Sequence, residues 1–272
     1  MRIVILGPSP YSESSIAVAV RLAKLGYTPA GALTLSSFNL PTLARKFGQW
    51  GSREVVGYVQ RKMFSHGQAK LRNPYLQPLL QNGGERFRSI RQLAKRYGFP
   101  VAVCKNQNTA KAVAQLREWS PDLAVFTGGN ILRQPLLNVP RLGIINLHLA
   151  MLPHVRGMST PEWSLLKSIP VGVTIHYIDA GVDTGPILAR FELPDLADCS
   201  SLDDLRNRLI AFGVEKVGEV VAGLDRGTIS AQPQSELNLD HQYFVIHERL
   251  KNLAARRLQQ TGRPLAEVEL HE

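Results

Sequence analysis

The stretch RIVILGPSPYSESSIAVAVRLAKLG, residues 2–26, decides the class of fold. Its first five residues, Arg2–Leu6, form an apolar run that Gly7 closes, as expected of a short buried strand. The apolar residues that follow recur at helical spacing until Gly26. The chain is therefore predicted to open with a strand, a turn and a helix.

The same alternation of strand and helix recurs further along the chain. Apolar strand-like runs are found at 31–35, 101–104, 123–127 and 143–147, with amphipathic stretches at 89–97 and 109–119 between the later ones. Strands that alternate with helices predict a Rossmann-like α/β fold, with a mostly parallel sheet and helices on both faces. In such sheets ligands bind at the carboxyl ends of the strands.

The second half of the chain is predicted to complete one domain and add a tail. Two further strands, 171–178 and 186–193, flank a glycine-rich loop, and 201–224 is a long amphipathic pattern that Ser200 or Ser201 can cap. We expect residues 1–232 to form one catalytic domain and 233–272 a helical tail. Within the tail, the basic amphipathic segment 243–258 is predicted to be one helix docked on the domain.

Composition narrows the class of protein. With 272 residues, 44% of them hydrophobic, the chain can bury a core without metals or cross-links. Its two cysteines, Cys104 and Cys199, have no pair or cluster spacing, so neither a disulfide framework nor a zinc site is indicated. No apolar run has the length of a signal peptide core or a membrane span. We expect a cytoplasmic protein without stable membrane insertion.

The positive charge is concentrated in one part of the chain. Between Arg45 and Arg96 there are twelve basic residues against Glu54 and Glu85, an excess that accounts for the whole net charge of +10. Residues 36–84 show no clear strand and are predicted to be a basic helical insertion between early strands, with helical patches at 42–47 and 54–64. Such a surface is either a solvated helical face or a site for an anion such as a nucleotide, RNA phosphates or a lipid surface.

The residues with the strongest chemical signal lie in INLHLAMLPHVRGMSTPEW, 145–163, and GVTIHYIDAGVDTGPIL, 172–188. Asn146 and His148 leave the end of a buried strand two residues apart, so their side chains point to the same side of the sheet. Asp183 lies in the glycine-rich loop that follows. An amide, an imidazole and a carboxylate are sufficient for acyl chemistry. Taken alone, Asn146 and His148 also fit a polar pair at the end of a strand.

Three motifs in this order, Asn146-Leu-His148, Leu-Pro with Arg-Gly at 152–157, and Val-Asp-Thr-Gly at 182–185, carry a resemblance. The chain resembles the 10-formyltetrahydrofolate-dependent formyltransferases, which include glycinamide ribonucleotide transformylase, methionyl-tRNA formyltransferase and the amino-sugar N-formyltransferases. The resemblance covers about 1–232 and is strongest at about 122–188. It implies the formyltransferase fold and transfer of a formyl group from 10-formyltetrahydrofolate, a co-substrate, to a primary amine without a metal.

The resemblance also implies roles for individual residues. Asn146 and a protonated His148 would stabilise the oxyanion of the tetrahedral intermediate, while Asp183 would orient His148 and relay protons. The folate pocket would be lined by Gly129, Asn130, Ile131 and Leu132 after the fourth strand, and by Ile178, Asp179 and Gly181 in the later loop. His176, on an apolar strand, fits a structural or pocket-wall role better than a catalytic one. Arg156 fits either the folding of its turn or acceptor binding.

The sequence narrows the choice of amine acceptor by elimination. Pro8 and Pro10 lack the N–H groups that a phosphate-binding turn needs, which counts against glycinamide ribonucleotide. Ser12, Ser14 and Ser15 at the start of the following helix could still bind an anion. About forty residues follow Pro233, too few for the tRNA-binding domain of the methionyl-tRNA enzymes, although the basic insertion could bind tRNA instead. We favour a small, anionic amine such as a nucleotide-linked amino sugar, with methionyl-tRNA as the alternative.

Two other classes of function rank lower. A formyltetrahydrofolate hydrolase would use the same residues on water, but the regulatory domain that usually precedes its catalytic domain is not expected in this chain. A non-catalytic folate-binding or membrane-surface module would use the amphipathic pattern Arg53–Phe64. A homodimer is left open.

Overall fold

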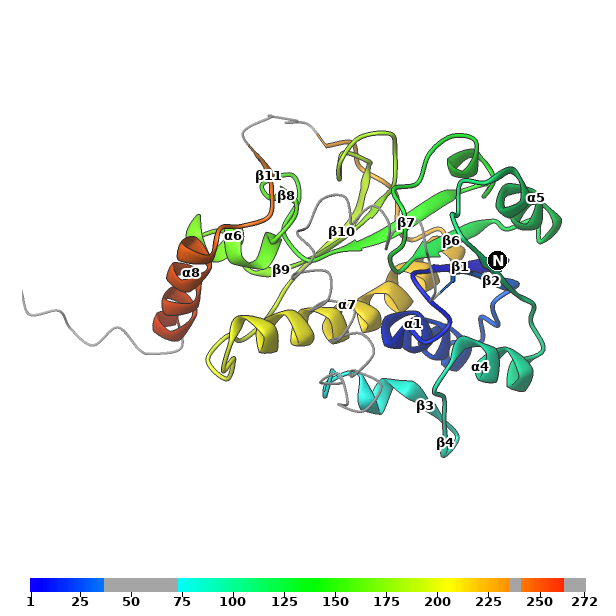
Figure 1. Cartoon of the computed structure of the whole chain (residues 1–272), viewed down its shortest axis with the longest axis horizontal. Helices are drawn as coiled ribbons and strands as arrows, with labels where there is room; N and C mark the ends of the chain where they lie inside the picture. The colour runs from blue at the N-terminus through cyan, green and yellow to red at the C-terminus, as the bar shows by residue number, and fades with distance from the viewer. Residues whose placement is uncertain (37–72, 235–240, 262–272) are drawn as a thin grey trace, which may run out of the picture.

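The computed structural model describes residues 1–36, 73–234 and 241–261. Its main sheet contains β1 (Ile3–Gly7), β2 (Gly31–Leu35), β5 (Val101–Cys104), β6 (Leu123–Phe126), β7 (Gly143–His148), β9 (Gly172–Tyr177) and β10 (Ile187–Glu192). The seven strands lie in the order β10-β9-β7-β6-β1-β2-β5 (Figure 1). All seven strand predictions are confirmed to within two residues at each end.

Strand direction confirms the mostly parallel sheet. β1 pairs in parallel with both β2 and β6, and the parallel pairing continues outward to β5 on one side and β7 on the other. β9 runs antiparallel to β7 and to β10. Because the chain moves outward from β1 in both directions, the order of strands reverses there, and a ligand crevice is expected at that switch point.

Helices cover both faces of the sheet, as predicted. α1 (Glu13–Lys24), α4 (Ile90–Tyr97) and α7 (Leu202–Asp225) share one buried cluster with Ile3 and Ile5 of β1. α5 (Ala110–Glu118) shares a second cluster with Val4 and Leu6, whose side chains point the other way. Alternate residues of each strand therefore feed two separate cores, which explains the continuous apolar runs.

The helices begin where the sequence supplies capping side chains. Ser12 Oγ accepts the N–H of Ser15 at the start of α1, and Ser201 Oγ accepts the N–H of Asp204 at the start of α7. Each cap satisfies a backbone donor that has no partner inside the helix. Ser201 is thus the predicted cap of the long helix, which ends at Asp225, one residue beyond its predicted end.

The prediction for the C-terminal helix is wrong at its start. Instead of 243–258, the helix α8 spans Glu248–Thr261, and Tyr243 lies in a short strand, β11 (Gln242–Tyr243). β11 pairs in parallel with β8 (Arg156–Gly157), far away in the sequence. Ala254 and Leu258 form the buried face of α8, while Phe244 is 73% exposed. Backbone pairing with a distant strand overrides the helical pattern of these residues, and a local pattern cannot reveal it.

The predicted helical insertion is not confirmed. Of 36–84, the structure describes residues 36 and 73–84, which contain the 3-10 turn η1 (Gln77–Leu80) and the strand β3 (Gln81–Asn82). β3 forms a hairpin with β4 (Glu85–Arg86), because Gly83 and Gly84 both adopt the positive φ that such a two-residue turn requires. The patches at 42–47 and 54–64 lie outside the described residues.

A third buried cluster joins the start of α7 to α8 and to α6 (Thr160–Leu166). Figure 1 shows α8 beside α6 at the end of the sheet that β9 and β10 form. Among the described helices, none has the length and apolar character needed to cross a membrane.

Candidate functional site

The candidate site lies at the carboxyl end of β7. It is on the face of the strand whose first residues pack against α5. Ile144 packs into the cluster around α5, and the next two residues on the same side of the strand are Asn146 and His148. The intervening Ile145 packs into the opposite core. The period of two in the strand thus brings the predicted amide and imidazole to one side, at the carboxyl end of β7.

The neighbouring strand adds a second histidine. In the antiparallel pairing of β7 with β9, Asn146 lies directly opposite His176. Asn146 Nδ2 lies 3.2 Å from His176 Nε2. His176 is 1% exposed. Strand pairing therefore joins two residues that are thirty positions apart in the sequence.

The loop after β9 carries Asp183 across the face of β7 to the same place. The N–H of Ile178 donates to the carbonyl of Ile144 at the start of the loop (2.7 Å), and Asp183 Oδ2 accepts the N–H of Gly157 (2.9 Å). Asp183 Oδ2 lies 3.5 Å from His148 Nδ1, and its Oδ1 lies 3.7 Å from His176 Nε2. The structure thus brings together all three predicted catalytic residues, with His176 as a fourth member.

Gln234, near the end of the predicted catalytic domain, binds the backbone of this loop. Gln234 Nε2 donates to the carbonyl oxygens of Asp183 (2.9 Å) and Gly185 (2.7 Å). Asp183 has a φ of 53°, a left-handed conformation that is strained for a residue with a side chain. The two hydrogen bonds from Gln234 help to stabilise that conformation.

His148 is more enclosed than the sequence suggests. Its side chain is 6% exposed and its Nε2 lies 2.8 Å from the carbonyl oxygen of Val155. A carbonyl only accepts hydrogen bonds, so Nε2 carries a proton, while Nδ1 faces Asp183. Both ring nitrogens therefore face protein atoms.

His176 is held neutral. Its Nδ1 lies 2.8 Å from the carbonyl oxygen of Tyr177, so Nδ1 carries the proton of the neutral ring. Burial, and then repulsion from a charge on His148, lower the pKa of His176 from 6.5 to about 4, although Asp183 acts in the opposite direction.

The predicted folate-binding residues after β6 are tied to a side chain that the sequence did not indicate. The backbone N–H of Gln107 donates to Asn130 Oδ1, and the backbone N–H of Asn130 donates to Gln107 Oε1, both at 3.3 Å. Gln107 Nε2 also donates to the carbonyl of Gly7 at the end of β1 (3.3 Å). Ile131 is 81% exposed, whereas Leu132 is buried in the cluster around α5.

The remaining predicted folate residues form a closed turn. Asp179 Oδ1 accepts the N–H of Gly181 (3.0 Å) and the hydroxyl of Thr184 (2.6 Å), and Ile178 packs against the cluster around α5. Because the Asp179 carboxylate binds its own loop, the backbone of this turn is better placed than that side chain to contact a ligand.

Sequence reasoning did not predict a functional role at the site for four groups that the structure places there. They are the His176 ring, the Gln107 and Gln234 amides and the Gly157 N–H. Each acts through a contact between residues far apart in the chain, so no local spacing could reveal it. The nearest sequence signal was His176 itself, a polar residue within an apolar strand.

The His148 and His176 ring nitrogens and an Asp183 oxygen lie within 4.8 Å of one another, a donor set that transition metals accept. His176 Nε2, however, already faces the Asn146 amide. The absence of a metal from the reaction stays a prediction.

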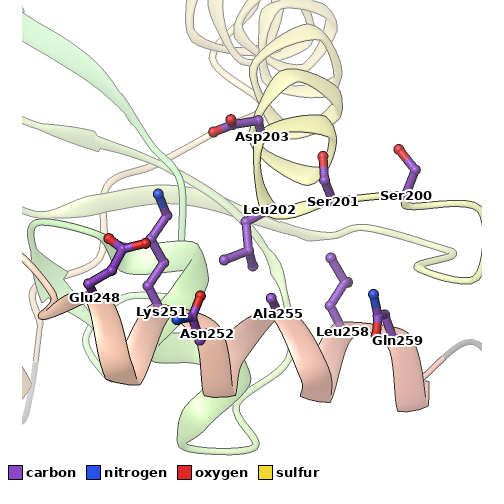
Figure 2. A pocket seen from close by; sticks show the side chains of 10 residues that line it. All are labelled: Ser200, Ser201, Leu202, Asp203, Glu248, Lys251, Asn252, Ala255, Leu258 and Gln259. Carbon is purple, nitrogen blue, oxygen red and sulfur yellow. The ribbon is translucent and has the colours of Figure 1, made fainter.

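A cavity of about 260 Å³ lies elsewhere, between the start of α7 and α8. Figure 2 shows Leu202 and Asp203 on the α7 side and Lys251, Ala255 and Leu258 on the α8 side. It contains none of the predicted site residues, and we assign it to the packing of α8 on the domain.

The fold and the site together define a class: an α/β protein in which an amide, two imidazoles and a carboxylate meet at the carboxyl end of a central strand. The family model described as formyl transferase matches residues 85–221, which is half of the chain. The chain belongs to this family.

Known relatives and solved structures agree with this assignment. The chain is 36% identical over 152 residues to a methionyl-tRNA formyltransferase of Geobacter metallireducens, a match that covers 54% of this chain and 48% of the relative. It is 37% identical over 150 residues to the enzyme of the same name from Pseudomonas paraeruginosa, with the same coverage. The chain thus spans about half the length of the curated relatives it matches.

Two solved structures share the fold. A sugar N-formyltransferase from a Shewanella species aligns with a TM-score of 0.55 and 18% identity, over 95% of this chain and 87% of that one. Glycinamide ribonucleotide transformylase 1 from Symbiobacterium toebii aligns with a TM-score of 0.53 and 17% identity, over 84% and 89%. These likenesses confirm the predicted formyltransferase fold.

Proposed function

We propose that this protein transfers a formyl group from 10-formyltetrahydrofolate to a primary amine. The observation that carries the proposal is the convergence of Asn146, His148 and Asp183 at one strand end in a member of the formyl transferase family.

The reaction needs one bond made and one broken. The acceptor's amine nitrogen attacks the formyl carbon, the oxygen on that carbon becomes an oxyanion, and collapse breaks the bond to the folate nitrogen, which takes up the proton that the amine loses. Asn146 has a side-chain N–H beyond the one it directs at His176, and this N–H stabilises the oxyanion. Removing a donor of this kind typically costs ~2.7–4 kcal/mol of transition-state stabilisation.

His148 and Asp183 act on the same intermediate. When the Val155 carbonyl turns away, His148 Nε2–H becomes a second donor to the oxyanion. Asp183, partly open to solvent and held by the Gly157 N–H, stabilises the positive imidazolium and passes the proton from the amine to the leaving nitrogen.

We propose that the donor binds between the loop after β6 and the loop after β9. Gly129 and Asn130 offer backbone groups at the end of β6, the exposed Ile131 offers apolar surface, and the turn from Ile178 to Gly181 offers the backbone that would read the pterin ring. The donor supplies the formyl carbon, and these residues bind and orient it.

For the acceptor we propose a small, anionic amine such as a nucleotide-linked amino sugar. The turn after β1 supports this choice over glycinamide ribonucleotide. Besides Pro8 and Pro10, the N–H of Tyr11 is directed at Ser9 Oγ (3.2 Å) and the N–H of Ser12 at the Ser9 carbonyl (3.3 Å). These donors are therefore engaged within the turn and are not directed at a phosphate.

Methionyl-tRNA is the second candidate acceptor. It is favoured because two relatives that are 36% and 37% identical to the matched half of this chain are methionyl-tRNA formyltransferases.

The test follows the release of tetrahydrofolate from 10-formyltetrahydrofolate with separate acceptors: amino-sugar nucleotides, glycinamide ribonucleotide, amino acids and methionyl-tRNA. His148→Ala is the test variant. His247→Ala is its matched control, because His247 lies in the segment before α8 and bonds the N–H of Arg249. We expect release that depends on an acceptor, is lost in His148→Ala and is kept in His247→Ala.

The other outcomes contradict specific parts of the proposal. Release without an acceptor would indicate a hydrolase, and release only with methionyl-tRNA would establish the second candidate. Equal rates in His148→Ala and the wild type would refute the site. No release with any acceptor, in a protein that still binds tetrahydrofolate, would favour a binding module.

A further inference from the structure

We infer that His176 is a positioning residue that fixes the orientation of the Asn146 side-chain amide, and with it the donor that faces the reacting oxygen. The inference rests on the proposed function, since it concerns the group that would stabilise the oxyanion.

The protons of the pair can be assigned from its partners. His176 Nδ1 faces the Tyr177 carbonyl at 2.8 Å, and a carbonyl can only accept, so Nδ1 is the protonated nitrogen. The lone pair of Nε2 then faces Asn146 at 3.2 Å. An amide NH2 can only donate and a neutral Nε2 can only accept, so the two groups match when Nδ2 lies on the His176 side.

The flipped amide is disfavoured. It would place Asn146 Oδ1 against the Nε2 lone pair. The repulsion would be relieved if His176 took up a second proton, or if its proton moved from Nδ1 to Nε2 at the cost of the hydrogen bond to the Tyr177 carbonyl. Burial and His148 oppose a second proton, while Asp183 and Asp179 favour it, and the balance keeps the pKa of His176 at about 4. At neutral pH His176 therefore favours the orientation in which Asn146 donates.

The chosen orientation matters for the proposed chemistry. With one Nδ2 proton bonded to His176, the second Nδ2 proton stays available to a ligand on the open side of the strand end. In a flipped amide, Oδ1 exchanges places with Nδ2, and an acceptor would oppose the developing oxyanion. A preorganised donor then becomes a repulsive group.

The experiment compares two substitutions at one position. His176→Gln keeps a side-chain oxygen that can reach the place of Nε2 and accept from Asn146, whereas His176→Phe fills the space without an acceptor. Ile175→Val is the matched control, because Ile175 is buried on the opposite face of β9 and its shortening perturbs the strand without touching Asn146.

We expect kcat to fall by about tenfold to a hundredfold in His176→Phe and to stay within about fivefold of the wild type in His176→Gln and Ile175→Val. The dissociation constant of tetrahydrofolate should change by less than about threefold in all three, because the effect is on the transition state. Wild-type kcat in folded His176→Phe, or an equal loss in both His176 variants, would overturn the inference.

A second measurement is independent of turnover. The side-chain amide of Asn146 is assigned in a 15N–1H spectrum by its loss in Asn146→Asp. In the wild type and in His176→Gln, one of its two protons should exchange slowly and be shifted from the position of a free amide. In the wild type, two fast-exchanging protons at the positions of a free amide would overturn the inference, even if His176→Phe did not fold. Because this readout needs no acceptor, it separates failure of the inference from failure of the proposed reaction.

Discussion

Replacement of His176 by glutamine should change how the stability of the protein depends on pH. In the unfolded chain a histidine titrates near pH 6.5, but in the folded protein burial and His148 lower the pKa of His176 to about 4. Between these values the unfolded chain binds the proton and the folded protein does not. The free energy of unfolding is therefore unaffected by this histidine above about pH 7. It falls as pH falls towards 4, because the unfolded chain binds the proton more readily.

The size of the effect follows from the two pKa values. At about 1.36 kcal/mol per unit, the difference between 6.5 and about 4 corresponds to about 3 kcal/mol when the titration is complete. At pH 5 about 2 kcal/mol of this is already lost. Glutamine does not titrate, so His176→Gln should lack this part of the acid sensitivity while keeping that of the other groups.

Urea unfolding at several pH values between 4.5 and 7.5, followed by circular dichroism, measures the effect for both proteins. The difference in unfolding free energy between wild type and His176→Gln should shift by about 2 kcal/mol, in favour of the variant, from pH 7.5 to pH 5. A difference that stays constant over this range would show that His176 is not held neutral, and would refute the reasoning.

Three further predictions concern one backbone position and two hydrogen-bonded contacts. Gly157→Ala should lower the free energy of unfolding by about 2–4 kcal/mol, since Gly157 has a φ of 97° and a Cβ there would meet the backbone of Tyr243. Thermal unfolding measures the loss, and an unchanged Tm would contradict it. Arg206→Met should cost about 3 kcal/mol in chemical unfolding, because Arg206 Nη2 bonds both oxygens of Glu162 (2.7 and 2.8 Å), which is 4% exposed. Adding Glu162→Gln should recover part of the loss. No recovery would argue against an unpaired buried charge as the cause. Gln234→Glu should cost about 2 kcal/mol and lower kcat, because a carboxylate cannot donate to the two loop carbonyls that Gln234 binds; unchanged kcat in a measurably destabilised variant would limit Gln234 to a structural role.

The sequence by itself determined the order and type of the main elements and the identity of three residues that the structure brings together. Strand runs such as Ile3–Gly7 are apolar throughout because both faces of the sheet are buried, and helices such as α7 begin at a serine that caps them, so both leave local signals. Asn146 and His148 were predicted to share a side because the alternation along a strand is itself local.

Only the tertiary structure decided which residues meet. The pairing of Asn146 with His176, the hydrogen bonds from Gln234 to the loop that contains Asp183, and the β11 strand that replaces the predicted start of the C-terminal helix all join distant positions. The Val155 carbonyl lies only seven residues from His148, but its approach to the ring depends on how the turn after β7 folds back. Period, capping and composition depend on neighbours within a few residues, whereas register, burial and hydrogen-bond partners depend on how the whole chain packs.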